Sequence, residues 1–243
     1  MTENCRQNRK VAVMQPYFFP YVGYFNLLHA CSKLIFLDNA KLNTRGWVCR
    51  NAISLQGKRH MFSVPLVGKS QNKDINQHQL FQFDEFRDKF LKTLHLEYSK
   101  YDNYPIIEKA IWDVFSNESQ RMDQLAITSV KVTCKLLGLN TEFRKASELP
   151  LKNDGASASE YIIQIMKYVG ATQYVNLPGG RSLYDPVYFK QEGIGIEFIL
   201  PKEPQYIDTK GTSRQSSGLS ILDVLFRMPR SNWGSVLTSY TLD

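Results

Sequence analysis

The chain has few cysteines and few histidines, and neither residue type is clustered. Its 243 residues include four of each. A zinc site would need paired cysteines or grouped histidines at ligand spacing, and the sequence has neither, so we expect no bound metal. The first ten residues, MTENCRQNRK, are polar and lack the apolar core of a secretory signal. We therefore expect a cytoplasmic protein with reduced thiols at Cys5, Cys31, Cys49 and Cys134.

Two further features are missing. No apolar run approaches the length that spans a bilayer, which argues against membrane insertion. The formal net charge is +7, but the basic residues are spread along the chain. A nucleic-acid-binding protein would ordinarily show a concentrated basic patch or a recognisable reader module. We therefore expect an anionic small molecule that carries phosphate, and no nucleic acid, as the partner.

The stretch from Val11 to Asp38 has the clearest structural pattern. It begins with the apolar run VAVM, which must end at Pro16, because proline cannot donate to a sheet and disfavours helix before it. Pro20 and Gly23 follow, and apolar residues then recur at helical spacing. A second apolar run, LIFL, ends at Asp38. The pattern predicts a strand, a tight turn, a helix and a second strand parallel to the first.

Polar and aromatic residues gather at the ends of these two strands. Open α/β sheets bind their ligands at the carboxyl ends of their strands. We therefore predict an active cleft formed by Gln15, Tyr17, Tyr21, Tyr24 and Asp38. The alternative is that the aromatic rings of this turn only pack it onto the core, as aromatic side chains commonly do.

The residues after Asp38 predict a β-hairpin. Residues 47–55 and 60–66 have strand patterns and flank a turn at Gln56 and Gly57. Such a hairpin would lie at the mouth of the cleft. Its side chains could stack on the ring of a ligand and pair with a phosphate or carboxylate group. The candidates are Arg45, Trp47, Arg50 and Asn51. The alternative is an exposed hairpin whose cations are solvated and contribute little.

The rest of the chain alternates helices and strands. Three apolar stripes predict helices within residues 84–139, the first capped by Asp84. Strand patterns follow at residues 141–145, 172–177 and 194–200, and Ser157 with Glu160 forms a capping box before a helix. Residues 201–218 have the composition of a mobile loop, and an amphipathic helix from Leu219 to Met228, with Ser220 and Asp223 on its polar positions, is expected to close the chain.

These elements predict an α/β fold of the Rossmann-like, three-layer kind. The sheet is expected to be mostly parallel and flanked by helices, with an inserted β-hairpin and a helical insertion around residues 84–139. Residues 1–10 are expected to be a flexible tail, and residues 11–243 a single domain.

A second group of candidate residues follows the strand at residues 172–177. Two glycines, an arginine and a serine precede a predicted helix start at Asp185 and Pro186, an arrangement that suits an anion such as phosphate. We assign substrate binding to Gly179, Gly180, Arg181, Ser182 and Tyr184. A bare turn explains the two glycines equally well.

Four segments carry a family resemblance: QPYFFPYVGYF, RGWVCRNAI, YVNLPGGRSLYD and LSILDVL. With them the sequence resembles the WbqC-like family of bacterial proteins, whose genes are associated with clusters for O-antigen and other surface polysaccharides. The resemblance spans Val11 to Leu225. It implies work on a nucleotide-linked sugar, with transfer of an acyl or aminoacyl group to an amino sugar.

An N-acyl transfer needs a base for the amine proton, a donor for the developing oxyanion and cations for the diphosphate. The candidates are Asp38 as the base, Gln15 and Tyr24 as polar contacts to the reacting group, and arginines for the phosphates, namely Arg45, Arg50 and Arg181. The acyl donor stays open between acyl-CoA and an acyl carrier protein, and the oligomeric state stays open too.

Two alternative functions remain. The order of strand, PYVGY, helix and strand is similar to that of nucleotidyltransferases and class I synthetases, which have histidines where this chain has Tyr21 and Tyr24. That likeness allows ATP-dependent adenylation, which the missing histidines disfavour. The other alternative is a non-catalytic carbohydrate-binding or scaffold protein of the same pathway, which would suit the many aromatic residues.

Overall fold

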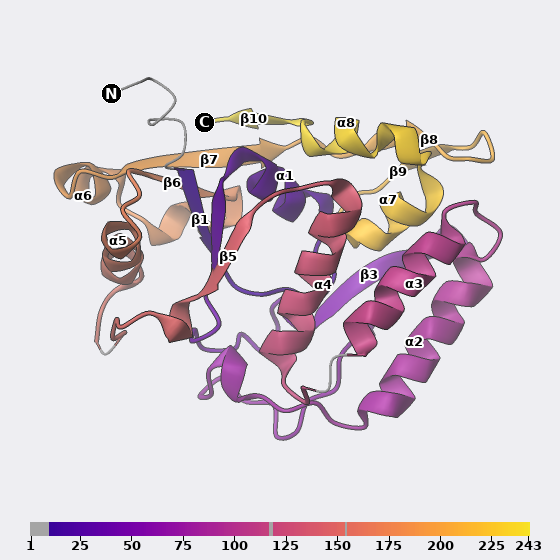
Figure 1. Cartoon of the computed structure of the whole chain (residues 1–243), viewed down its shortest axis with the longest axis horizontal. Helices are drawn as coiled ribbons and strands as arrows, with labels where there is room; N and C mark the ends of the chain where they lie inside the picture. Colours follow the sequence, from indigo (N-terminus) through magenta and orange to yellow (C-terminus); the bar gives the residue numbers. More distant parts are fainter. Residues whose placement is uncertain (1–9, 117–118, 154) are drawn as a thin grey trace.

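The computed structural model describes residues 10–116, 119–153 and 155–243 (Figure 1). The tail expected at residues 1–10 therefore lies outside the described residues, apart from Lys10. The main sheet has six strands in the spatial order β10-β7-β6-β1-β2-β5. Five strands are mutually parallel and the last is antiparallel to its neighbour: β1 (Lys10–Met14), β2 (Lys33–Phe36), β5 (Glu142–Lys145), β6 (Gln173–Asn176), β7 (Gly195–Pro201) and the antiparallel β10 (Tyr240–Leu242).

The strand order has the doubly wound form. Strand β1 pairs with β2 on one side and with β6 on the other, so the chain builds outward first in one direction and then in the other. The point of reversal lies between β1 and β6, which is the topological switch point of such a sheet. The structure thus confirms the predicted Rossmann-like arrangement with its mostly parallel sheet.

Helices cover both faces of the sheet (Figure 1). Ala12 of β1 belongs to a large core with α1 (Val22–Ala30), whereas Val11 and Val13 belong to a second core with α5 (Ala158–Tyr168). Successive side chains of a strand point to opposite faces, which explains this division. The second core also contains α6 (Pro186–Gln191), and the first contains α7 (Ile221–Arg227) and α8 (Trp233–Leu237).

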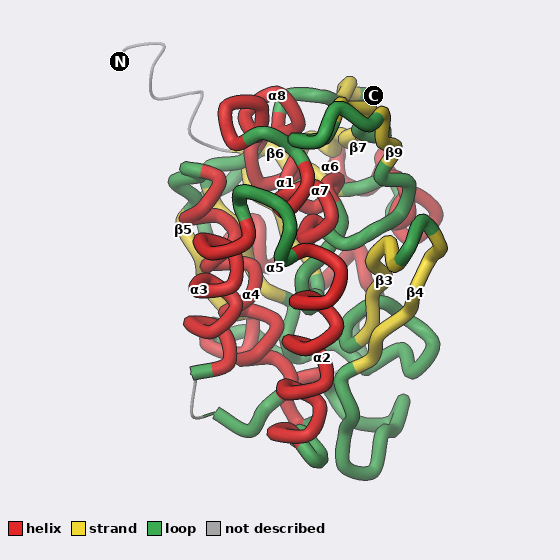
Figure 2. Tube along the Cα trace, turned by 90° about the vertical axis from the view of Figure 1, so that its right-hand side faces the viewer, coloured by secondary structure: helices red, strands yellow, loops and turns green. Residues whose placement is uncertain are grey.

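The segment between β2 and β5 holds the hairpin and three helices. The hairpin strands are β3 (Arg50–Leu55) and β4 (Lys58–Ser63), joined at Gln56 and Gly57, which both have positive φ. Figure 2 shows the three helices side by side, with the hairpin beside the first. They are α2 (Phe83–Tyr98), α3 (Tyr104–Phe115) and α4 (Met122–Leu137). Short 3-10 turns are η3 (Ile75–Gln77), η4 (Ala146–Glu148), η5 (Pro178–Leu183) and η6 (Arg230–Asn232).

The helix ends confirm one of the predicted helix caps and contradict another. The Ser157 hydroxyl accepts from the backbone N–H of Glu160, and the Glu160 carboxylate accepts from the N–H of Ser157, so the capping box is confirmed. The cap expected at Asp84 is wrong, because α2 begins one residue earlier. Asp84 lies in the first turn instead, where it is 2.6 Å from Arg87.

Residues 201–218, expected to form one long loop, include regular secondary structure. They contain a second hairpin, β8 (Gln205–Ile207) with β9 (Ser213–Gln215). The Asp208 carboxylate accepts from the backbone N–H groups of Lys210 and Thr212, each at 2.9 Å, which closes the turn. The chain also continues past α7 into α8 and β10. Ser220 and Asp223, expected on a polar face, are buried.

Within the described ranges, no helix combines the length and the apolar character needed to cross a membrane.

Candidate functional site

A cleft of about 540 Å³ opens at the carboxyl ends of β1 and β6, where the strand order reverses. Its size is typical of small-molecule sites, and its position is the usual ligand site of a doubly wound sheet. The lining residues come from the strand ends, the turn after β1, the loop before β3, the first hairpin, the turn after β6 and the segment before α7: Val13, Met14, Gln15, Tyr17, Pro20, Tyr21, Leu37, Trp47, Asn51, Arg59, Asn176, Leu177, Gly179, Gly180, Leu183, Tyr184 and Gly218.

The turn after β1 is held in a demanding conformation. Phe19 has a φ of 43°, in the left-handed region that bulky residues rarely adopt. Its carbonyl accepts hydrogen bonds from Asn51 Nδ2 at 2.6 Å and from the Ser220 hydroxyl at 2.8 Å. Its N–H donates to the Ser129 hydroxyl at 3.0 Å. Three distant segments therefore fix the turn that presents Tyr17 and Tyr21 to the cleft.

Gly23 lies in close contact with two neighbouring side chains. A Cβ at Gly23 would lie 2.4 Å from the Tyr21 ring and 2.7 Å from Pro201. Only glycine leaves room for the ring of Tyr21 against the start of α1. The glycine thus positions a cleft residue.

Several polar groups in the cleft have no partner in the described part of the chain. They are the side-chain amide of Gln15 and the hydroxyls of Tyr17 and Tyr21. Burial raises the pKa of Tyr17, and burial together with Tyr17 raises the pKa of Tyr21 to about 12. Both hydroxyls therefore keep their protons at neutral pH and can donate hydrogen bonds to a ligand.

The charge of the cleft comes from the first hairpin. Arg59 is the one charged residue in the described lining, which contains neither a carboxylate nor a histidine. Its Nη1 donates to the Ser217 carbonyl at 3.4 Å, and a Cβ at Gly218 would lie 3.4 Å from the same nitrogen. The guanidinium carbon is 5.8 Å from the centre of the Trp47 ring. An anionic group and an aromatic ring could bind together here.

Two predicted residues lie beside the cleft rather than in its lining. The Asp38 side chain is fully buried, and its carboxylate accepts from the Ser147 backbone N–H at 3.0 Å and from the Ser147 hydroxyl at 2.5 Å. Tyr24 is also fully buried, and its hydroxyl donates to the Gln15 carbonyl at 3.1 Å. Burial raises the pKa of Tyr24 well above the ordinary value. In the structure both side chains brace the strand ends.

The predicted arginines also have other partners. Arg50 donates to the Arg45 carbonyl, and its guanidinium carbon is 5.0 Å from the centre of the Trp47 ring. Arg181 pairs with Asp243 and lies over the Phe198 ring at 4.7 Å. These three arginines and Ser182 are absent from the lining of the cleft. The other predicted residues do line it: Gln15, Tyr17, Tyr21, Trp47, Asn51, Gly179, Gly180 and Tyr184.

Sequence reasoning missed two polar residues of the lining, Arg59 and Asn176. Arg59 follows the turn of a predicted hairpin, and the hairpin geometry was the available signal that it could face the same ligand as Trp47. Asn176 is the last residue of β6, and a polar side chain at a strand's carboxyl end was a signal of the kind used for Gln15.

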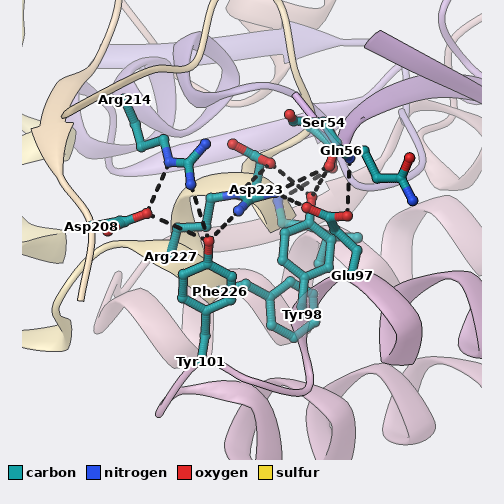
Figure 3. Close-up of polar contacts among 12 residues, drawn as sticks. Ser54, Gln56, Glu97, Tyr98, Tyr101, Asp208, Arg214, Asp223, Phe226 and Arg227 are labelled. Carbon is teal, nitrogen blue, oxygen red and sulfur yellow. Dashed lines mark hydrogen bonds and ion pairs between the residues drawn. The ribbon is translucent and has the colours of Figure 1, made fainter. Parts of the chain in front are cut away.

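A second polar cluster lies away from the cleft and is shown in Figure 3. We call it the Arg227 network: Glu97, Tyr98, Tyr101, Asp208, Arg214, Asp223 and Arg227. Arg227 is 1% exposed. It donates to Glu97 at 2.6 Å and to Asp223 at 3.0 Å, and a further bond reaches the Tyr101 hydroxyl.

The network joins four separate parts of the chain. Arg227 on α7 also donates to the Ser54 carbonyl of β3 at 3.1 Å. Glu97 on α2 accepts from the backbone N–H of Gln56 at 3.0 Å. In the second hairpin, Arg214 donates to Asp208 at 2.8 Å. Because every charge has a partner, we interpret the network as a structural clamp rather than a second reaction site.

Among the described residues, no group of three or more histidines, cysteines and carboxylates could hold a metal ion.

Comparison with known proteins identifies relatives but no activity. The family model described as the WbqC-like protein family matches residues 15–233. A protein of Mycobacterium tuberculosis, named Uncharacterized protein Rv1507c, is 24% identical over 222 residues, which cover 90% of this chain and 94% of that protein. No solved structure matches the chain significantly.

Proposed function

The chain belongs to the WbqC-like protein family, and on that premise we propose that it transfers an acyl or aminoacyl group to the amine of a nucleotide-linked sugar. The observation that carries the proposal is the cleft at the switch point, which combines one arginine, several aromatic rings and unpaired neutral donors. A nucleotide sugar has the matching groups: a diphosphate, a flat base and a hydroxylated ring. We further propose that the reaction serves surface-polysaccharide synthesis in the cytoplasm.

We assign the diphosphate to Arg59 and the base to Trp47. A guanidinium forms charge-assisted hydrogen bonds with phosphate oxygens, and an indole ring offers a face for stacking. Gln15 and Tyr21, which present unpaired polar groups, would contact the sugar. This assignment gives the phosphates to Arg59 of the first hairpin in place of the three arginines that the sequence indicated, Arg45, Arg50 and Arg181.

The proposed reaction requires only a few functional groups from the cleft. The sugar amine attacks the carbonyl carbon of a thioester donor, a C–N bond forms and the C–S bond breaks. The carbonyl oxygen carries negative charge in the intermediate, so neutral hydrogen-bond donors near it lower the barrier. The Asp38 carboxylate is already hydrogen-bonded to Ser147, so we do not assign it the role of base. The amine proton passes instead to water or to the leaving thiolate.

Binding of a thymidine-diphosphate amino sugar, measured by calorimetry, tests the proposal. Arg59→Ala should weaken binding by roughly 10- to 100-fold, which is the range expected for a hydrogen bond to a charged group. Arg181→Ala is the matched control and should bind normally, because Arg181 pairs with Asp243. Equal losses in both variants would contradict the assignment of the phosphates.

A non-catalytic carbohydrate-binding protein of the same pathway is a second candidate. It is favoured by the lack of a carboxylate or histidine among the described lining residues. Calorimetry with a neutral oligosaccharide separates the two. Tight binding of the oligosaccharide, with no formation of amide from the amino sugar and acetyl-CoA, would favour the second candidate.

A further inference from the structure

Three side chains near β6 form a chain of hydrogen bonds that ends in the cleft. Asn176 Nδ2 lies 2.8 Å from the Tyr174 hydroxyl, which lies 3.2 Å from the Tyr184 hydroxyl. Asn176 and Tyr174 are buried, and Tyr184 lines the cleft. Figure 1 locates β6, which carries the first two residues, next to the central strand β1.

The direction of these hydrogen bonds can be assigned. Asn176 Oδ1 accepts from the backbone N–H of Leu177 at 2.7 Å, so the NH₂ group of Asn176 faces Tyr174 and can only donate. The Tyr174 oxygen accepts this bond, and its proton has two possible acceptors. The Tyr184 oxygen is nearer, at 3.2 Å, than the Val13 carbonyl, at 3.4 Å. With the nearer group, Tyr184, as the acceptor of the Tyr174 proton, the proton of Tyr184 is free for a ligand.

Gly180 provides the space for this arrangement. A Cβ at Gly180 would lie 2.5 Å from Asn176 Nδ2 and 3.2 Å from the Tyr184 ring. The first distance is shorter than real Cβ contacts allow, so even alanine would displace the Asn176 amide. At Gly179, in contrast, no atom lies within 4 Å of an added Cβ. The second glycine of the pair is thus explained by the side chains around it, without a bound phosphate.

We propose that Asn176, Tyr174 and Gly180 are positioning residues that hold the Tyr184 hydroxyl as a hydrogen-bond donor to the acyl carbonyl oxygen of the donor substrate. The inference rests on the proposed acyl transfer. When the amine adds to the carbonyl carbon, the π electrons move to this oxygen, and they return as the C–S bond breaks. Tyr184 keeps its proton throughout, because burial raises its pKa above the ordinary value, although the hydrogen bond from Tyr174 opposes that rise.

Steady-state kinetics with a thymidine-diphosphate amino sugar and acetyl-CoA test the proposal. Tyr184→Phe removes the donor and should lower kcat by about 100-fold, the loss typical of an oxyanion donor. Tyr174→Phe leaves the donor but not its alignment, so kcat should fall by about tenfold with KM for the amino sugar unchanged. Tyr168→Phe, at a half-exposed tyrosine of α5, is the control and should leave both constants unchanged.

The glycine offers a second variant. Gly180→Ala should lower kcat as Tyr174→Phe does, whereas Gly234→Ala, where no atom lies within 4 Å of the added Cβ, should not. The circular dichroism melting curve of each variant shows whether it is folded. A folded Tyr174→Phe or Gly180→Ala protein with wild-type kcat would overturn the proposal.

A measurement without substrate separates this inference from the proposed function. In protein labelled with ¹³Cζ-tyrosine, the Tyr184 signal, assigned through Tyr184→Phe, should move at pH 7 on Tyr174→Phe and stay in place on Tyr168→Phe. A moved signal in a protein that acylates no amino sugar would reject the acyl transfer and retain the hydrogen-bond chain. A signal unmoved by Tyr174→Phe would reject the chain even in an active enzyme.

Discussion

The cleft and the Arg227 network are both rich in polar side chains, but only the cleft includes side chains whose polar groups have no partner among the described residues. In the cleft, the Gln15 amide and the Tyr17 and Tyr21 hydroxyls have no partner in the described part of the chain. In the network, the three carboxylates and two guanidiniums all have partners, and Arg227 alone contacts Glu97, Asp223, Tyr101 and the Ser54 carbonyl. The side chains of Gln15, Tyr17 and Tyr21 are only partly buried, so their polar groups stay available to a ligand, whereas those of the network are already engaged.

The network also supports the cleft from a distance. It ties α2 and α7 to β3, the strand that carries Asn51 of the cleft lining. It also holds the second hairpin, which is followed by Ser217 and Gly218 beside Arg59. The comparison therefore separates residues that meet the ligand from residues that set the position of the cleft walls.

The largest effect expected is on stability, in the network. Arg227→Met leaves Glu97 and Asp223 buried without a cation, and should lower the free energy of unfolding by about 3–5 kcal/mol. Urea denaturation at pH 7 measures it. Arg181→Met, which breaks an ion pair exposed by about half on both sides, should cost no more than about 1 kcal/mol. Similar losses in the two variants would remove the distinction between a buried clamp and a surface pair.

Local pattern was enough for much of the sheet and too little for the network. The run Val11 to Met14 and the capping box at Ser157 involve neighbours in the sequence, so periodicity and capping chemistry predict them. Glu97 and Arg227 are 130 positions apart. Nothing in the sequence near either residue indicates the other, and Asp223 was expected on a polar surface for the same reason.

The site was predictable to the extent that strand ends determine it. Gln15 directly follows β1, Tyr21 ends the turn between β1 and α1, and both line the cleft. The direction of a long side chain depends on tertiary contacts, which local sequence does not show. Arg181 follows the glycine pair, as expected of an anion contact, but its guanidinium lies over Phe198 and pairs with Asp243.

Variants of Asp38 test whether this residue meets the ligand or supports the fold. Asp38 stands at a strand end near the cleft, yet its carboxylate is paired with Ser147. Asp38→Ala should lower the free energy of unfolding by about 1–3 kcal/mol, because it leaves the Ser147 N–H without a partner. Ser147→Ala removes only the hydroxyl and should cost about 1 kcal/mol. An Asp38→Asn protein of unchanged stability that has lost turnover would show instead that Asp38 is a catalytic base.

A smaller loss of stability is expected at low pH. Burial disfavours the charged form of Asp208, but hydrogen bonds from Thr212, Arg214 and Lys210 outweigh it and hold its pKa below the ordinary value. The stabilisation this carboxylate supplies is therefore present above about pH 4, its pKa in an unfolded chain, and is lost as the pH falls through the lower, folded pKa. Urea denaturation from pH 6 to pH 2 should show a shallower acid loss in Asp208→Asn than in the wild type. Parallel pH curves would contradict this.

The smallest expected effect is that of removing the Tyr21 hydroxyl from the cleft. Burial and Tyr17 raise the pKa of Tyr21 to about 12, so the Tyr21 hydroxyl stays protonated from pH 6 to 9. The contribution of this hydroxyl to binding should therefore be constant in that range and be lost only as the pH approaches 12. Tyr21→Phe should weaken binding of a thymidine-diphosphate amino sugar about two- to tenfold, the value of one neutral hydrogen bond, and by the same factor at every pH in that range. Calorimetry at pH 6, 7.5 and 9 measures this, with Tyr168→Phe as the control. If the wild type lost affinity between pH 7.5 and 9 while Tyr21→Phe did not, Tyr21 would be ionising near neutral pH. The cleft would then contain an anionic group in addition to Arg59, and its tyrosine hydroxyls would no longer be neutral donors, in contrast to the Arg227 network whose charges are already paired.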